Sequence, residues 1–189
     1  DISMATGASI SGSGNGAGKT IPFKNLTFST GTNTVSEKIS VAEDLTCRDT
    51  MAFSKDVSVA GQVIIIDDTT FTNAIDFGTA EISVTGGNNT DNITITAPSI
   101  KASSITCTDN NSSYLELDGA GGITITGNIG SSSNEYKAVK LDAGSNSISV
   151  GGHIYTSNID VTCASVTFND AIYVGSVAIH AGTVSINGL

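Results

Sequence analysis

The 189-residue chain carries 18 acidic and 8 basic residues, which gives a net charge of −10 at neutral pH. Serine and threonine together supply 49 residues, whereas tryptophan is absent and charged residues are only 14% of the chain. The acidic excess would repel a phosphate backbone, and the longest purely aliphatic run, Val63–Ile66, is far shorter than the ~20 residues of a membrane-spanning helix. We therefore expect no nucleic-acid partner and no membrane span.

Residues 1–20 are rich in glycine and serine, and we separate them from a domain over residues 21–189. The first segment could be a flexible lead-in, a tail that packs on a neighbour, or a first structural repeat. Its end, Ser13–Thr20, nearly spells a phosphate-binding loop. Ser13 stands where the motif needs glycine, and Pro22 opposes the helix that must follow. We therefore expect no nucleotide site there.

From Leu26 onward, apolar and hydroxyl residues alternate in short runs, the pattern of half-buried strands. Gly- and Asn-rich turns separate these runs, because both residues tolerate the backbone angles of tight corners. The predicted strands include 26–29, 39–41, 57–59, 82–84, 93–96, 123–126, 148–150 and 184–186, and the predicted turns include 86–89, 109–112, 127–128, 143–146 and 151–152. Residues 134–141 could form either a short helix or a strand.

The fold class is therefore all-β, and we predict a single-domain parallel β-solenoid (a β-helix), with an antiparallel β-sandwich as the alternative. Outward Ser, Thr and Asn can form hydrogen-bonded rows from coil to coil, and the few aromatic residues suit a narrow interior. We expect coils of roughly 19–20 residues, about eight coils, and an apolar column. Its inward residues would include Ile93, Ile95, Ile123, Ile125, Ile148 and Val150.

Cys47, Cys107 and Cys163 share an aliphatic-Thr-Cys context and recur at two similar intervals along the chain. Both intervals are close to three such coils, so we expect one repeated position on the solenoid. At three coils apart the sulfurs would lie ~14 Å from one another, which is too far for a disulfide. We predict three buried free thiols, and no metal site, since no nearby ligand completes a set.

Residues with catalytic chemistry are sparse. His153 and His180 have no carboxylate or nucleophile at a diagnostic spacing, and a single arginine, Arg48, cannot build a groove for acidic sugars. The adjacent acids Glu43-Asp44 and Asp67-Asp68 would point to opposite faces of a strand, so turns explain them better than a catalytic pair. We predict a protein that is not an enzyme, with no catalytic, cofactor-binding or metal-binding residues.

Three further patterns have structural explanations. Asn88–Asn92 and Asp109–Asn111 are better explained as turns than as Ca²⁺ ligands. Thr-x-Thr pairs begin at Thr94, Thr106 and Thr124, and their uneven spacing does not form the regular array of an ice-binding face. Five glycosylation sequons begin at residues 25, 88, 92, 110 and 111, about as many as this composition gives by chance.

The segment 123–162 carries Thr126-Gly127-Asn128-Ile129-Gly130, then an alternating strand and the run Gly-Gly-His-Ile-Tyr at 151–155. It resembles the passenger repeats of rickettsial-type surface antigens, which are autotransporters. The resemblance implies a right-handed parallel β-helix that acts in adhesion or surface coating. The chain departs from that family in having three cysteines, and we expect no membrane barrel within these 189 residues.

These observations predict a non-catalytic, secreted structural protein located outside the cell or at its surface. Its solenoid ends would expose unpaired backbone groups and favour a homo-oligomer that grows end to end into a filament. An adhesive autotransporter passenger fragment is the alternative, with host or surface glycans as further candidate partners. A carbohydrate-active β-helix enzyme and an ice-binding protein are the alternatives from other functional classes.

Overall fold

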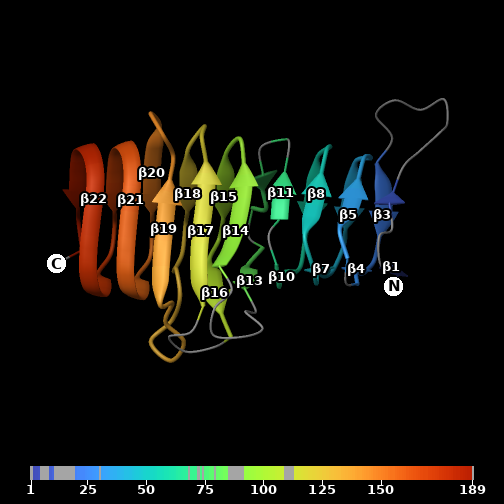
Figure 1. The fold of residues 1–189 in the computed structure, drawn as a ribbon, viewed down its shortest axis with the longest axis horizontal. Helices are drawn as coiled ribbons and strands as arrows, with labels where there is room; N and C mark the ends of the chain where they lie inside the picture. The colour runs from blue at the N-terminus through green and yellow to red at the C-terminus, as the bar shows by residue number, and fades with distance from the viewer. Residues whose placement is uncertain are drawn as a thin grey trace.

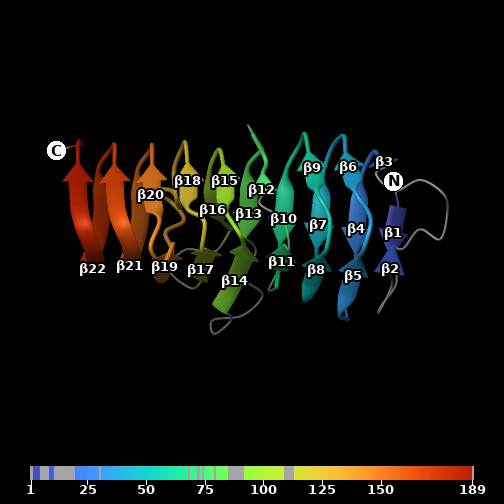
Figure 2. The same cartoon turned by 90° about the horizontal axis from the view of Figure 1, so that it is seen from above.

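The computed structural model is a rod of stacked coils, with the two ends of the chain at opposite ends of the rod (Figures 1 and 2). The structure describes residues 2–4, 9–10, 20–29, 31–67, 69–71, 73, 75–78, 80–84, 92–108 and 113–188. Every strand pairing among them is parallel, and the chain visits three faces in turn before it starts the next coil. The parallel β-solenoid is thus confirmed, and the antiparallel sandwich is wrong.

Face 1 is a sheet in which each strand pairs with the strand three elements further along the chain. It consists of β1 (Ile2–Met4), β4 (Leu26–Phe28), β7 (Leu45–Cys47), β10 (Val63–Ile65), β13 (Ile82–Val84) and β16 (Ile105–Cys107). Single bridges then continue the face from Ile105 to Ile129 and from Ile129 to Ile154.

Face 2 has the longest strands of the central coils. It consists of β2 (Ser9–Ile10), β5 (Asn33–Val35), β8 (Met51–Phe53), β11 (Thr69–Phe71), β14 (Asn92–Ala97), β17 (Tyr114–Gly119) and β19 (Ala138–Asp142). Buried and accessible residues alternate along β17 and β19, as the period-2 pattern requires.

Face 3 is made of two groups of strands. The first group is β3 (Ile21–Phe23), β6 (Ile39–Val41) and β9 (Val57–Val59), and the second is β12 (Ile75–Asp76), β15 (Ile100–Ala102), β18 (Ile123–Ile125) and β20 (Ser147–Val150). Finally, β21 (Ile154–Phe168) and β22 (Ile172–Ile186) each run continuously around all three faces.

Coil length varies along the rod. The first coil is long, since Ile2 pairs with Leu26, and the next coils are short, since Ile21 pairs with Ile39. The central coils are long again, as Leu115↔Val139 shows, and the last is short, as Ile154↔Ile172 shows. The predicted coil length therefore fits only the short coils, and the prediction of about eight coils is confirmed. Strands β1 and β2 pair with β4 and β5, so these two parts of the first segment lie in a first coil.

A continuous apolar column fills the rod from Leu26 to Phe168. The six inward residues predicted from the alternation are all at most 1% exposed. Where the prediction emphasised aliphatic filling, the N-terminal half adds a stack of phenylalanines, in which Phe53 lies 4.9 Å from Phe71 with nearly parallel rings. Burial of this column removes apolar surface from water, and each Å² removed stabilises the fold by ~25 cal/mol.

An ambiguous segment and a predicted turn lie within the described residues. The segment 134–141 contains the start of β19 and no helix, so its strand alternative is the right one. The turn at 143–146 is present, with Gly144 at a positive φ of 53°. The predicted turns at 86–89 and 109–112, like residues 13–19, lie outside the described residues.

Candidate functional site

The adjacent acids Glu43-Asp44 form part of a corner, as predicted. Asn25 donates a hydrogen bond from Nδ2 to Glu43 (2.8 Å) and accepts one from the Asp44 backbone N–H (2.8 Å). The Asp44 carboxylate in turn accepts the backbone N–H of Gln62 one coil later (2.9 Å). Asn25, which begins a sequon, therefore satisfies backbone groups at a turn. Of the second acidic pair, Asp67 lies in a bend and Asp68 is outside the described residues.

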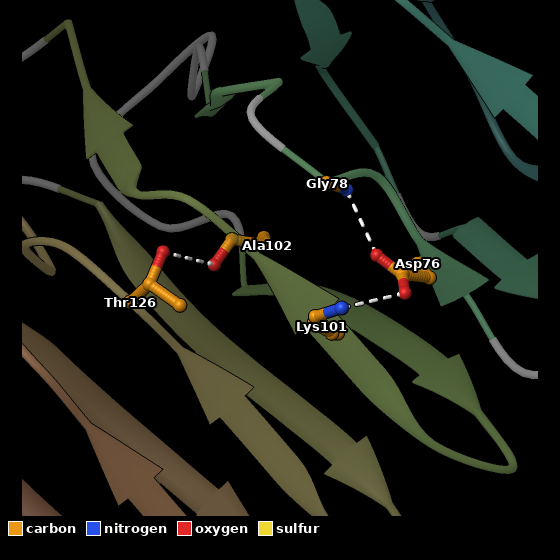
Figure 3. Close-up of polar contacts among 5 residues, drawn as sticks. All are labelled: Asp76, Gly78, Lys101, Ala102 and Thr126. Atoms are coloured by element: carbon orange, nitrogen blue, oxygen red, sulfur yellow. Dashed lines mark hydrogen bonds and ion pairs between the residues drawn. The ribbon is translucent and has the colours of Figure 1, made fainter.

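Four lysines pair with carboxylates in the neighbouring coil. The pairs are Lys24–Glu43, Lys38–Asp56, Lys101–Asp76 and Lys140–Glu116, with N–O distances between 2.6 and 3.3 Å. In Figure 3 the Asp76 carboxylate accepts both Lys101 Nζ at 2.7 Å and the Gly78 N–H at 2.9 Å. These two contacts hold the pKa of Asp76 below its ordinary value. Because all these side chains are between about one third and two thirds exposed, the pairs act as modest links between coils.

The two histidines lie near the C-terminal end of the rod. His153 Nδ1 is 3.2 Å from an Asp170 oxygen without hydrogen-bond geometry, and its ring packs edge-on against Tyr155 and Tyr173. The two tyrosine rings are stacked 4.8 Å apart. His180 is 3.9 Å from Asp160. No group of three metal-ligating side chains occurs among the described residues.

All three cysteines are buried, and none is in a disulfide. Cys47 and Cys107 share a face-1 column and are three coils apart, as predicted. Burial raises the pKa of the Cys47 thiol to about 12, which keeps it neutral. The predicted shared position is wrong for Cys163, which lies on β21 opposite Ala181, near the end of face 2. Unequal coil lengths shift it out of the column.

One hollow, with a volume of about 410 Å³, lies on the outer side of face 2 and crosses β17, β19, β21 and β22. Two outward columns line it, and we call it the face-2 hollow. The first column is Tyr114, Ala138, Asn158 and Ser176. The second column is Glu116, Lys140, Asp160 and Ala178.

The side chains of the face-2 hollow are linked to one another. Lys140 Nζ lies 2.6 Å from Glu116, and this contact raises the lysine pKa. Asn158 donates to the Lys137 carbonyl (3.1 Å) and accepts from the Ser176 hydroxyl (2.5 Å). Lys137 Nζ lies 5.1 Å from the centre of the Tyr114 ring. The sequence pattern does not predict this constellation, because the columns align only when the unequal lengths of the three successive coils are known.

The second distinctive surface is the C-terminal end of the rod, which we call the β22 end. Strand β22 pairs with β21 on one side, and no other described strand pairs with it. Inward positions that are buried elsewhere are exposed here. Val177 is 50% exposed, although its column partner Ile159 is 3% exposed. Val184 and Ile186 are each 45% exposed.

Comparisons with protein-family models, with curated proteins and with solved structures gave no significant match to this chain. The resemblance of residues 123–162 to autotransporter passenger repeats therefore stays a prediction. The described part of the chain contains no helix that could cross a membrane.

Proposed function

We propose that this chain is a non-catalytic structural protein that stacks end to end with further copies to form a fibre or surface filament outside the cell. The β22 end is the observation that carries the proposal. It combines an edge strand of 15 residues with exposed apolar side chains in the core columns. Unpaired strand edges of this kind favour addition of another strand.

The opposite end of the rod offers the matching edge. In face 1, β1 presents Ile2, which is 47% exposed, in the column that runs through paired strands and single bridges to Ile172 of β22. In face 3, β3 presents the partly buried Ile21 and Phe23 at one end of the rod, and β22 presents Val184 and Ile186 at the other. A second copy would therefore set apolar side chains against apolar side chains on both faces.

Coil size matches in part. The register advances equally from β3 to β6 and from β21 to β22, as Ile21↔Ile39 and Ile154↔Ile172 show. The first coil is longer, since Ile2 pairs with Leu26, so the proposal rests on the apolar edges rather than on equal coil length. A head-to-tail contact of this kind does not close on itself, and it propagates into a filament. The extracellular location belongs to the same proposal and rests on the surface, whose outward positions are mostly uncharged hydroxyl and amide side chains.

The experiment is sedimentation velocity and electron microscopy of the 189-residue chain over a range of concentrations. We expect filaments that lengthen with concentration. Val184→Lys should abolish them, because it places a charge in the apolar end of the column. Thr183→Lys is the matched control: it adds the same charge to the adjacent, outward-facing position of β22 and should leave assembly unchanged.

Ile2→Lys tests the other end independently and should also stop assembly. Circular dichroism should show an unchanged β-sheet spectrum for all three variants. A chain that stays monomeric at every concentration would overturn the proposal. So would filaments that form equally well with Val184→Lys and Ile2→Lys.

A further inference from the structure

The face-2 hollow has the shape of a site for a linear ligand. It crosses four coils, and at ~4.8 Å between neighbouring strands it extends about 14 Å along the rod. Its volume of about 410 Å³ is within the ~300–1,000 Å³ range of small-molecule sites. Ala138 and Ala178 keep it open, because each stands in a column whose other members have longer side chains.

The lining combines hydrogen-bonding groups with apolar surface. Asp160 is exposed and offers carboxylate oxygens, which form strong, charge-assisted hydrogen bonds with hydroxyl donors. Asn158 and Ser176 are held in place by their mutual hydrogen bond. The Tyr114 ring and the two alanines supply apolar contacts beside these polar groups. Sugar rings present the same mixture, with hydroxyls at their edges and C–H groups on their faces.

The charges that line the face-2 hollow disfavour both anionic and polycationic ligands. Two carboxylates, Glu116 and Asp160, line the face-2 hollow against one ammonium group, and Asp118 and Asp142 follow in the next outward column. An anionic ligand would be repelled by this surface. A polycation would meet Lys140 in the middle of the site and Lys137 beside Tyr114. We infer that the face-2 hollow binds a neutral, hydroxyl-rich carbohydrate chain that lies along the solenoid axis.

The face-2 hollow overlaps the β22 end only at Ser176, Val177 and Ala178, and it exists on each copy without filament formation. Ser176 and Ala178 point outward, whereas Val177 lies in the core column. Loss of carbohydrate binding would therefore leave the assembly proposal untouched, and loss of assembly would leave the face-2 hollow intact on each copy.

The experiment is a titration of the 189-residue chain with cellohexaose, chitohexaose and mannohexaose, followed by calorimetry and by NMR shifts of backbone amides. A galacturonic acid hexamer and hexalysine serve as the anionic and cationic probes. We expect saturable binding of at least one neutral hexasaccharide, with shifts concentrated at Tyr114, Asn158 and Ser176.

Two variants locate the binding. Ala138→Tyr fills the face-2 hollow without removing a polar group and should weaken binding by at least ~10-fold. Asp160→Asn removes one charge-assisted acceptor and should also weaken it by ~10-fold. Ala164→Tyr is the control for the first variant, since Ala164 is exposed on the same rod outside the hollow. It should bind like the parent chain.

The inference is overturned if none of the three neutral hexasaccharides binds. It is also overturned if Ala138→Tyr binds as well as Ala164→Tyr, or if the galacturonic acid hexamer or hexalysine binds more tightly than every neutral probe. Thermal melts of the variants separate these outcomes from unfolding, because a folded Ala138→Tyr chain keeps the cooperative transition of the parent.

Discussion

The last two coils and the central coils enclose the same apolar column but differ in coil length and in the number of separate strands. In β21 and β22 the chain turns around all three faces in short coils, as two continuous strands. Between β16 and β20 the coils are longer, as the partners Ile105↔Ile129 and Ile123↔Ile148 show, and they use separate strands with longer corners. The shared feature is the inward column, so the corners can vary while the core repeats.

Their links between coils also differ. The N-terminal and central coils use lysine–carboxylate pairs, whereas no lysine or arginine follows Lys140. In the last coils the links are neutral: Ser176 donates to Asn158, and Asn187 donates to Asn169. Charge is therefore dispensable for stacking, and the backbone ladder and the apolar column hold the coils together.

Glycine at a positive φ occurs at corners between Gly31 and Gly144 and is absent from the described residues 154–188. At Gly130 the φ is 73°, and a Cβ would lie 2.6 Å from the Tyr155 carbonyl oxygen. We expect Gly130→Ala to lower the free energy of unfolding by about 3 kcal/mol, measured by urea denaturation. Gly144→Ala is the control: its φ of 53° is similar, but no atom lies within 4 Å. An equal loss for both variants would refute the role of the Tyr155 contact.

The column Val139–Ile159–Val177 runs from a buried coil to the β22 end. Val139 is 1% exposed and Val177 is 50% exposed. Val139→Ala should therefore cost about 2 kcal/mol of unfolding free energy, and Val177→Ala should cost less than half as much in the monomer. Thermal or urea unfolding at low concentration checks this difference. Equal losses would mean that the last coil is covered in the monomer.

Acid should loosen the charged coils before the neutral ones. The backbone N–H groups of Gly31 and Thr50 lower the pKa of Asp49 from its ordinary value of 3.8, and Lys101 does the same for Asp76. The unfolded chain then binds more protons, so this stabilisation is complete above pH ~4 and is lost as the pH falls through the lower folded-state values. Hydrogen exchange should show β5 and β12 losing protection before β21. Asp49→Asn should flatten the acid dependence, and an unchanged profile would contradict the assignment.

The smallest expected effect concerns the surface pairs. Lys101→Ala removes the pair with Asp76, in which both side chains are about half exposed. We expect a loss of under ~1 kcal/mol that shrinks as salt is added. Asn187→Ala, which removes a neutral link, should show no such salt dependence. A salt-independent loss for Lys101→Ala would show that its aliphatic stem, rather than its charge, stabilises the coil.

The sequence predicted the fold because one signal, the period-2 alternation, repeats at every coil and does not depend on register. It placed Ile93, Ile123 and Ile148 in the core from local pattern alone. The alternation does not predict which residues of neighbouring coils pair with one another. Tyr136, fully buried with its hydroxyl bonded to the Thr106 carbonyl at 2.8 Å, lies in a single bridge without alternating neighbours.

The same limit applies to the sites. The displacement of Cys163 from its expected column and the alignment of Tyr114 with Ala138 both depend on unequal corner lengths. The β22 end, by contrast, follows from a pattern that the sequence shows, since Val184-Ser185-Ile186 alternates like a buried strand. The sequence pattern does not identify the partner that would bury Val184 and Ile186.

Hydrogen exchange at the β22 end tests the central claim most directly. The Ile154 N–H donates to Ala171 in the following coil at 3.2 Å, and Ile172 is the equivalent residue of β22, at the edge with no described strand beyond it. If copies stack end to end, the amides of Ile172 and of alternate residues along β22 will exchange fast in dilute solution and become protected as concentration rises. Fast exchange along β22 at every concentration, with β21 protected throughout, would contradict the account.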